Sequence, residues 1–291
     1  MHPRPIYFVI VSIFVTLGMT PLTHAISLPS GDGDFLLDVP PGQMRVLTFV
    51  PDGFVPDSPV LIVMHGVKRD ADRYRHVWRN IAAKANALLL VPEFANEMWP
   101  KSWGYNLGNM RTKDGRDIPR DVWSFTAMDS AFDKAKELTG STRRGYRLYG
   151  HSAGAQFVHR FIMFTGGLRV ERAVAANAGW YTLPRNDDDF PYGLGGIDIE
   201  DDTLRQAFSA NLTILLGEND NDPNGKYLRR TPEALAQGAH RLARGATYFA
   251  SAQHTAAKMN APLAWQLKTV PGVGHSNKGM APAASDILFE K

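Results

Sequence analysis

The sequence predicts an α/β fold in which a mostly parallel central sheet is flanked by helices on both faces. Two uninterrupted apolar runs, at 59–64 and 87–92, have the pattern of strands that are buried on both faces. A stretch with apolar residues at helical spacing lies between them, at about 72–85. Strands that alternate with helices are joined by right-handed crossovers, and such connections build a parallel sheet.

The remaining elements continue this alternation along the chain. Further strands are expected at 35–39, 45–50, 172–178, 212–217 and 266–270. Further helices are expected from the N-cap Asp121 to Gly140, from Thr231 to about Lys258, and at 281–289. The segment 93–119 has no periodicity, and loops of that length are uncommon unless they are functional. A polar insertion from Trp180 to Thr203 lies where a lid or substrate loop is expected.

The first 25 residues differ in kind from the rest of the chain. His2 and Arg4 precede an apolar run at 6–19, and small residues follow at 23–25, where a signal peptidase reads the chain. The alternative is an uncleaved membrane anchor, but the run is shorter than the ~20 residues that a spanning helix needs. We therefore expect a signal peptide at 1–25, one domain at 26–291, a secreted or periplasmic location and no membrane attachment after cleavage.

Composition excludes several classes of protein. The chain has 291 residues and no cysteine, so an exported form relies on its core rather than on disulfides, which suits a bacterial protein. The formal charge is +3, and the Lys and Arg residues are scattered rather than clustered. Binding to nucleic acid therefore has no support, whereas a preference for an anionic substrate is compatible with the charge.

Residues 146–157 predict a buried strand that turns sharply into a helix, with Ser152 at the bend. Gly150 and Gly154 lie two residues before and two after this serine, where a side chain would collide with a neighbouring strand or helix. The following helix begins with free backbone N–H groups, so the amide of Ala153 is a candidate to stabilise an oxyanion. This is the pattern of a nucleophile elbow. The alternative is a tight turn whose serine has no chemical role.

A serine hydroxyl becomes an effective nucleophile when a base accepts its proton and a carboxylate orients that base. In an open parallel sheet, such partners lie in loops beyond the carboxyl ends of later strands. The loop after 212–217 contains Asp220 and Asp222, and the loop after 266–270 contains His275. Both partners are therefore available at the expected edge of the sheet.

With Ser152, Asp220 and His275 in this order, each after a strand, the chain resembles the α/β-hydrolase family over nearly all of residues 26–291. The resemblance implies the α/β-hydrolase fold, a catalytic triad of these three residues and no cofactor. Asp220 matches the family's Gly-x-x-Asp spacing, and Asp222 is the alternative acid. The resemblance also implies that the backbone N–H of Val67 is the second oxyanion donor, paired with that of Ala153.

The His65–Gly66 pair and the elbow look most like bacterial esterases related to poly(3-hydroxybutyrate) depolymerases and feruloyl esterases. Those enzymes often carry cysteines and a polymer-binding domain, which this chain lacks. The secreted poly(aspartic acid) hydrolases are similar in outline. The expected function is therefore that of a serine esterase acting on a small or polymeric ester. The alternatives are hydrolysis of an amide, as in poly(aspartic acid), and a hydrolase-fold protein that only binds a ligand.

Five aromatic residues follow strand ends and are candidates to line a substrate cleft: Trp99, Trp103, Tyr105, Trp180 and Tyr181. The alternative is that these side chains pack the long loops onto the domain. The stretch 220–225 also matches the first half of a calcium-binding loop. However, Thr231 stands at the twelfth position, where a bidentate Glu is needed, so no metal site is expected.

Overall fold

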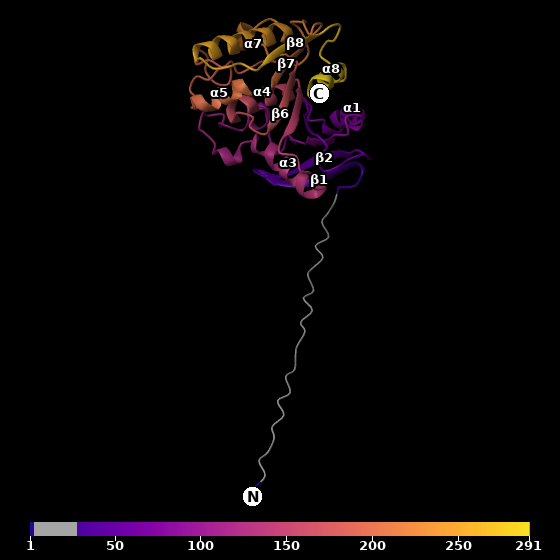
Figure 1. Ribbon diagram of the computed structural model, residues 1–291. Helices are drawn as coiled ribbons and strands as arrows, with labels where there is room; N and C mark the ends of the chain where they lie inside the picture. Colours follow the sequence, from indigo (N-terminus) through magenta and orange to yellow (C-terminus); the bar gives the residue numbers. More distant parts are fainter. Residues whose placement is uncertain (3–27, 291) are drawn as a thin grey trace.

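The computed structural model describes residues 28–290 and the first two residues, and it contains one sheet of eight strands in the order β1-β2-β4-β3-β5-β6-β7-β8 (Figure 1). The pairs β1–β2 and β2–β4 are antiparallel, and all other pairs are parallel. The predicted fold class, a mostly parallel sheet between layers of helices, is confirmed. The signal peptide predicted at 1–25 lies almost entirely outside the described residues.

The elements have the following bounds. The strands are β1 Gly31–Val39, β2 Gly42–Val50, β3 Val60–Met64, β4 Leu88–Pro92, β5 Tyr146–His151, β6 Val170–Ala176, β7 Leu212–Gly217 and β8 Gln266–Val270. The helices are α1 Ala71–Lys84, α2 Lys101–Gly104, α3 Thr126–Thr139, α4 Ala153–Thr165, α5 Asp201–Ser209, α6 Pro232–Ala236, α7 Arg241–Lys258 and α8 Asn277–Phe289, with a 3-10 turn at Arg120–Val122.

The two faces of the sheet carry separate apolar layers. Alternate residues of β3 divide between them, with Leu61 and Val63 on one face and Ile62 and Met64 on the other. Helices α1 and α8 cover the first face, and α3, α4, α5 and α7 cover the second (Figure 1). Because both faces are covered, the central strands are fully buried, which explains their uninterrupted apolar runs.

Three helix boundaries differ from the sequence prediction. Asp121 does not cap α3, because Trp123 takes an extended conformation (φ −65°, ψ 140°) and the helix begins only at Thr126. The helix predicted from Thr231 to Lys258 is two helices, since Gly238 takes a φ of +144° and His240 caps a new helix. The last helix begins at Asn277 rather than at 281, because the side chain of Ser276 accepts a bond from the Gly279 N–H.

One strand begins earlier than expected, and two helices were not expected from the sequence. Strand β1 begins at Gly31 rather than at residue 35, because its full length pairs with β2. The short helix α2 lies in the segment without periodicity, and helix α5 begins at Asp201, inside the polar insertion, and packs against α4 and α7. Among residues 1–2 and 28–290, no helix is both long enough and apolar enough to cross a membrane.

Three histidines are buried within the domain: His65 after β3, His151 at the end of β5, and His159 on α4. Burial lowers the pKa of His65 to about 3, and it holds the pKa values of His151 and His159 well below their ordinary value. Each imidazole is therefore neutral in the folded protein at neutral pH.

We expect the free energy of unfolding to fall as the pH drops below about 6.5. In the unfolded chain these histidines take up protons near their ordinary pKa, whereas the folded chain keeps them neutral far below it. The unfolded state thus binds more protons, and each histidine lowers stability by about 1 kcal/mol between pH 7.5 and 5.5. Urea denaturation at the two pH values measures the effect. An unchanged free energy of unfolding would contradict it.

Candidate active site

Ser152 lies at a sharp turn between β5 and α4, with a φ of +61° and a ψ of −115°. A residue with a side chain rarely adopts a positive φ, so the surrounding packing must hold it there. A Cβ on Gly154 would lie 2.2 Å from the Met64 carbonyl oxygen, and one on Gly150 would lie 2.2 Å from the Gly154 carbonyl oxygen. The predicted steric role of the two glycines is confirmed.

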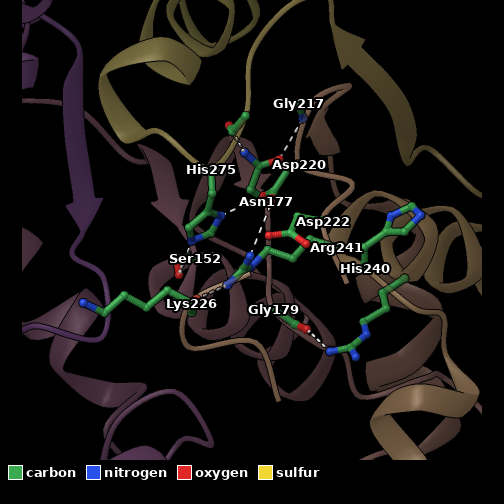
Figure 2. A network of polar contacts seen from close by, with 12 residues as sticks. Ser152, Asn177, Gly179, Gly217, Asp220, Asp222, Lys226, His240, Arg241 and His275 are labelled. Atoms are coloured by element: carbon green, nitrogen blue, oxygen red, sulfur yellow. Dashed lines mark hydrogen bonds and ion pairs between the residues drawn. The ribbon is translucent and has the colours of Figure 1, made fainter. Parts of the chain in front are cut away.

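The structure brings together the three side chains that lie after β5, β7 and β8 (Figure 2). The Nε2 atom of His275 lies 3.0 Å from the Ser152 Oγ, and its Nδ1 lies 2.7 Å from the Asp220 Oδ2. With Nδ1–H donating to the buried carboxylate, Nε2 carries the lone pair that faces the serine hydroxyl. The three side chains thus have the geometry that a nucleophile, its base and an orienting acid require.

Asp222, the alternative acid in the sequence analysis, occupies a different position. Its side chain is exposed, and its Oδ1 accepts a bond from the Asn224 N–H at 2.8 Å. This is an Asx turn within the loop. Asp220 rather than Asp222 therefore contacts His275.

Sequence reasoning missed the partner of Asp220. The Nη1 of Arg241 donates to the Asp220 Oδ1 at 3.2 Å, and both side chains are at most 4 % exposed. A second donor of Arg241 bonds the Lys226 carbonyl at 2.9 Å. Arg241 reaches this place because the break at Gly238 puts it in the first turn of α7. The sequence predicted one continuous helix here, and within it Arg241 would not stand in a first turn.

Asn177 was also missed. It follows β6 with a φ of +52°, and its Oδ1 accepts a bond from the Gly217 N–H at 2.7 Å. Its Nδ2 donates to the Gly274 carbonyl at 3.2 Å. One amide thus fixes the end of β7, which precedes Asp220, to the residue just before His275. Only the pairing order of the sheet identifies this role.

The predicted oxyanion donors, Val67 and Ala153, both line the cavity next to Ser152. Ala153 is the first residue of α4, and Val67 lies in the turn after β3. His65 orders that turn, since its Nδ1 donates to the Gly66 carbonyl and its Nε2 accepts from the Phe94 N–H. Burial lowers the pKa of His65, so this imidazole is neutral and its Nε2 can accept the bond from the Phe94 N–H.

Two cavities meet at Ser152. The larger, about 340 Å³, is lined by Ala153, Gln156 and Trp180, and the smaller, about 220 Å³, by His151, His275 and Ser276. Ser152, Val67 and Tyr227 border both. Ser152 therefore lies at the junction of a two-part cleft.

The larger cavity is strongly cationic. Four basic residues line it, and no Asp or Glu does so: Arg69, Lys101, Arg229 and Arg241. Its other polar side chains are uncharged amides and hydroxyls, from Asn96, Asn106, Gln156, Ser102, Ser152, Tyr105 and Tyr227. Such a cavity attracts anions and repels cationic groups.

Of the five aromatic residues predicted to line a substrate cleft, Tyr105 and Trp180 line the larger cavity, and the other three do not. Trp99 is 1 % exposed and packs on Phe94, and Tyr181 is fully buried and stacks on Tyr248. Trp103 packs outside the cavity, beside Phe190. The long loops fold down onto the domain, and most of their aromatic rings anchor them there rather than face a ligand.

The insertion that begins at Trp180 is also fixed to the domain. Gln237 bonds both the backbone N–H and the carbonyl of Tyr181, and the Thr182 N–H donates to the His159 Nε2 on α4. Only Trp180 of this segment borders the cleft. In the part of the chain that the structure describes, no cluster of His, Cys, Asp or Glu has the arrangement of a metal site.

Comparisons with known proteins agree with this geometry. No protein-family model and no curated protein sequence matches the chain. Among solved structures, poly(aspartic acid) hydrolase-1 from Sphingomonas sp. KT-1 is 40% identical with a TM-score of 0.88, over 90% of this chain and 100% of the other. A poly(3-hydroxybutyrate) depolymerase from Bordetella parapertussis is 34% identical with a TM-score of 0.85, over 90% and 91% of the two chains.

More distant structures share the fold alone. An S-formylglutathione hydrolase from Agrobacterium tumefaciens is 13% identical with a TM-score of 0.57, over 90% of this chain and 98% of the other. The two closer matches cover almost the whole domain at identities that indicate common descent. The chain therefore belongs to the α/β-hydrolase superfamily, and within it the chain is similar to a poly(aspartic acid) hydrolase and to a poly(3-hydroxybutyrate) depolymerase.

Proposed function

We propose that the protein is a serine hydrolase that cleaves acyl bonds in a carboxylate-rich polymer of the poly(aspartic acid) type. Ser152 is the nucleophile, His275 the general base and acid, and Asp220 the residue that orients His275. The observation that carries the choice of substrate is the cavity beside Ser152, which four basic residues and no acidic residue line.

In the proposed mechanism, His275 Nε2 accepts the Ser152 proton as Oγ attacks the scissile carbonyl carbon. The backbone N–H groups of Val67 and Ala153 stabilise the resulting oxyanion. His275 then gives the proton to the leaving amine or alcohol, which departs and leaves an acyl-enzyme. Water, activated by the same imidazole, releases the acid and restores the serine. The His275–Asp220 bond of 2.7 Å supports this assignment, because the carboxylate stabilises the imidazolium at both steps.

The basic residues of the larger cavity favour a polyanion as the substrate. In a polymer of the poly(aspartic acid) type, the bond that is cleaved is an amide. The hydrolase of poly(aspartic acid) with 40% identity supports the same substrate class. The second candidate is cleavage of a polyester, which the 34% identical poly(3-hydroxybutyrate) depolymerase supports. A triad serves both bonds, so the bond type depends on what the cleft binds.

A polymer in the surroundings of a cell is too large to cross the membrane without a carrier, so an enzyme that degrades such a polymer acts outside the cytoplasm. We therefore propose that residues 1–25 direct export and are removed, and that 26–291 is the mature catalytic domain. The pattern of His2, Arg4 and the apolar run supports this proposal.

Replacement of the nucleophile tests the catalytic assignment. We expect Ser152→Ala to lower kcat by about 10⁴-fold or more, because the triad acts as a unit. A fluorophosphonate probe should label the wild type at Ser152, and peptide mapping will identify the labelled residue. Substantial turnover by Ser152→Ala, or labelling elsewhere, would contradict the assignment.

The two loop aspartates offer a matched pair of variants. Asp220→Asn should lower kcat by on the order of 10³- to 10⁴-fold, because the amide no longer holds His275 in the productive tautomer. Asp222→Asn, in the same loop and equally conservative, should change kcat by less than about threefold. Steady-state kinetics on one ester substrate compares them. Similar losses in both variants would show that neither is the orienting acid.

The substrate class is tested with the polymers themselves. Residues 26–291 should shorten poly(aspartic acid), as seen by size-exclusion chromatography and by release of amino groups. Raising the salt to about 0.5 M should increase KM several-fold, since exposed charges are then screened. Clearing of a poly(3-hydroxybutyrate) suspension with no shortening of poly(aspartic acid) would select the polyester candidate instead.

A further inference from the structure

The two cavities at Ser152 are not equivalent, because His275 borders only one of them. His275 lines the smaller cavity together with Ser276, whereas Ala153 and Trp180 line only the larger one. In the mechanism proposed above, the leaving group receives its proton from His275 Nε2. The leaving half of the substrate therefore occupies the smaller cavity, and the acyl half occupies the larger one.

The charges of the two cavities differ in the same sense. In the smaller cavity, Arg73 faces Asp70 at 3.6 Å, which leaves Lys68 as its one basic side chain without an acidic neighbour. By the same criterion the larger cavity keeps three basic side chains without an acidic neighbour among the described residues, because Arg241 pairs with Asp220 and the other three do not pair with a carboxylate. Recognition of negative charge is thus concentrated on the acyl side of the scissile bond.

In two arginines of the larger cavity, most hydrogen-bond donors already bond other groups of the protein. Arg69 bonds the backbone carbonyls of Phe94, Trp99 and Lys101. Arg241 bonds Asp220 and the Lys226 carbonyl, and it is 3 % exposed. Lys101 is a point charge, with no planar edge for a carboxylate.

Arg229 is different. Its side chain makes one hydrogen bond, from Nη1 to the Tyr192 hydroxyl at 3.1 Å, and no carboxylate of the described residues lies within 4.0 Å of it. Its guanidinium stacks 4.3 Å from the centre of the Trp180 ring, which holds the group in place. The Nε and Nη2 donors form the edge that fits a carboxylate with two parallel bonds.

A second cation, which is buried, adds to the positive charge beside Trp180. Arg160 lies 4.3 Å from the same Trp180 ring, fully buried, and it bonds Thr182, Asn106 and Gln156 but no carboxylate. Burial, with the nearby Arg229, lowers the pKa of Arg160 to about 9. Two guanidiniums around one indole without an acidic partner leave positive potential that an anion can neutralise.

The chemistry of the proposed polymer matches this arrangement. In poly(aspartic acid), each aspartyl residue carries its free carboxylate two carbons from the scissile carbonyl, whether it is α- or β-linked, as succinate does. We propose that Arg229 is a specificity-determining residue that binds this carboxylate on the acyl side of the scissile bond. The inference rests on the proposed serine hydrolase function.

Two pairs of esters, each differing by one charge, test the inference by titration of the released acid. Monomethyl succinate and methyl succinamate differ on the acyl side, and carboxymethyl butyrate and carbamoylmethyl butyrate differ on the leaving side. In the wild type, we expect kcat/KM to favour the acyl-side carboxylate over its amide by about tenfold or more. The leaving-side ratio should be smaller.

Arg229→Gln should lower the acyl-side ratio by about tenfold, and Arg229→Lys, which keeps the charge but loses the planar edge, should retain part of it. Arg230→Gln is the matched control, because Arg230 is exposed and borders neither cavity. The ratio is informative even if a variant folds less well, because a loss of folded enzyme lowers both rates equally.

Three results would overturn the inference. In the wild type, kcat/KM could be the same for the acyl-side carboxylate and its amide, or the preference for a carboxylate could be larger on the leaving side. Arg229→Gln could also keep the acyl-side preference of the wild type unchanged. In those cases Ser152-dependent turnover of the esters would leave the serine hydrolase proposal intact. No hydrolysis of any of the four esters and no fluorophosphonate labelling would instead refute the proposed function, and the inference with it.

Discussion

The site depends on the close approach of the turn at Ser152 to the end of β3. With no Cβ at Gly154, the α4 backbone lies against the Met64 and His65 carbonyls, within 3 Å of where a Cβ would stand. This contact forces Ser152 into its positive φ and sets its hydroxyl outside the sheet edge. It also places the first amide of α4 and the turn at Val67 beside one cavity. The geometry around the serine is thus a consequence of backbone packing.

The second constraint is the burial of Asp220. A carboxylate that is 4 % exposed requires partners, and the structure supplies His275 on one oxygen and Arg241 on the other. Arg241 also bonds Lys226, and Arg244 bonds the Arg229 carbonyl, so the start of α7 holds the whole 218–231 loop. Helix α7 therefore fixes both Asp220 and the segment that carries Arg229. In the proposed mechanism, one helix thus supports both the triad and the binding of the anionic substrate.

The arginines around the cleft are held mainly by backbone carbonyls and aromatic rings. Arg69 bonds three carbonyls and lies over Tyr105, and Arg244 bonds three more. Partners of this kind fix the position of a guanidinium without cancelling its charge, as a carboxylate would. Such a wall keeps its positive potential for an anionic ligand, which accounts for the choice of substrate proposed for this protein.

The sequence by itself determined the sheet, the elbow at Ser152 and the two loops that carry Asp220, Asp222 and His275, because apolar periodicity and turn chemistry are local properties. Only the tertiary structure decided that Asp220 rather than Asp222 contacts His275, that Arg241 and Asn177 support the site, and that Trp99 and Tyr181 are buried. It also decided the cationic character of the cleft, since its basic residues come from segments far apart in the chain. Contacts between distant segments depend on how the layers pack, and local sequence patterns do not predict this packing.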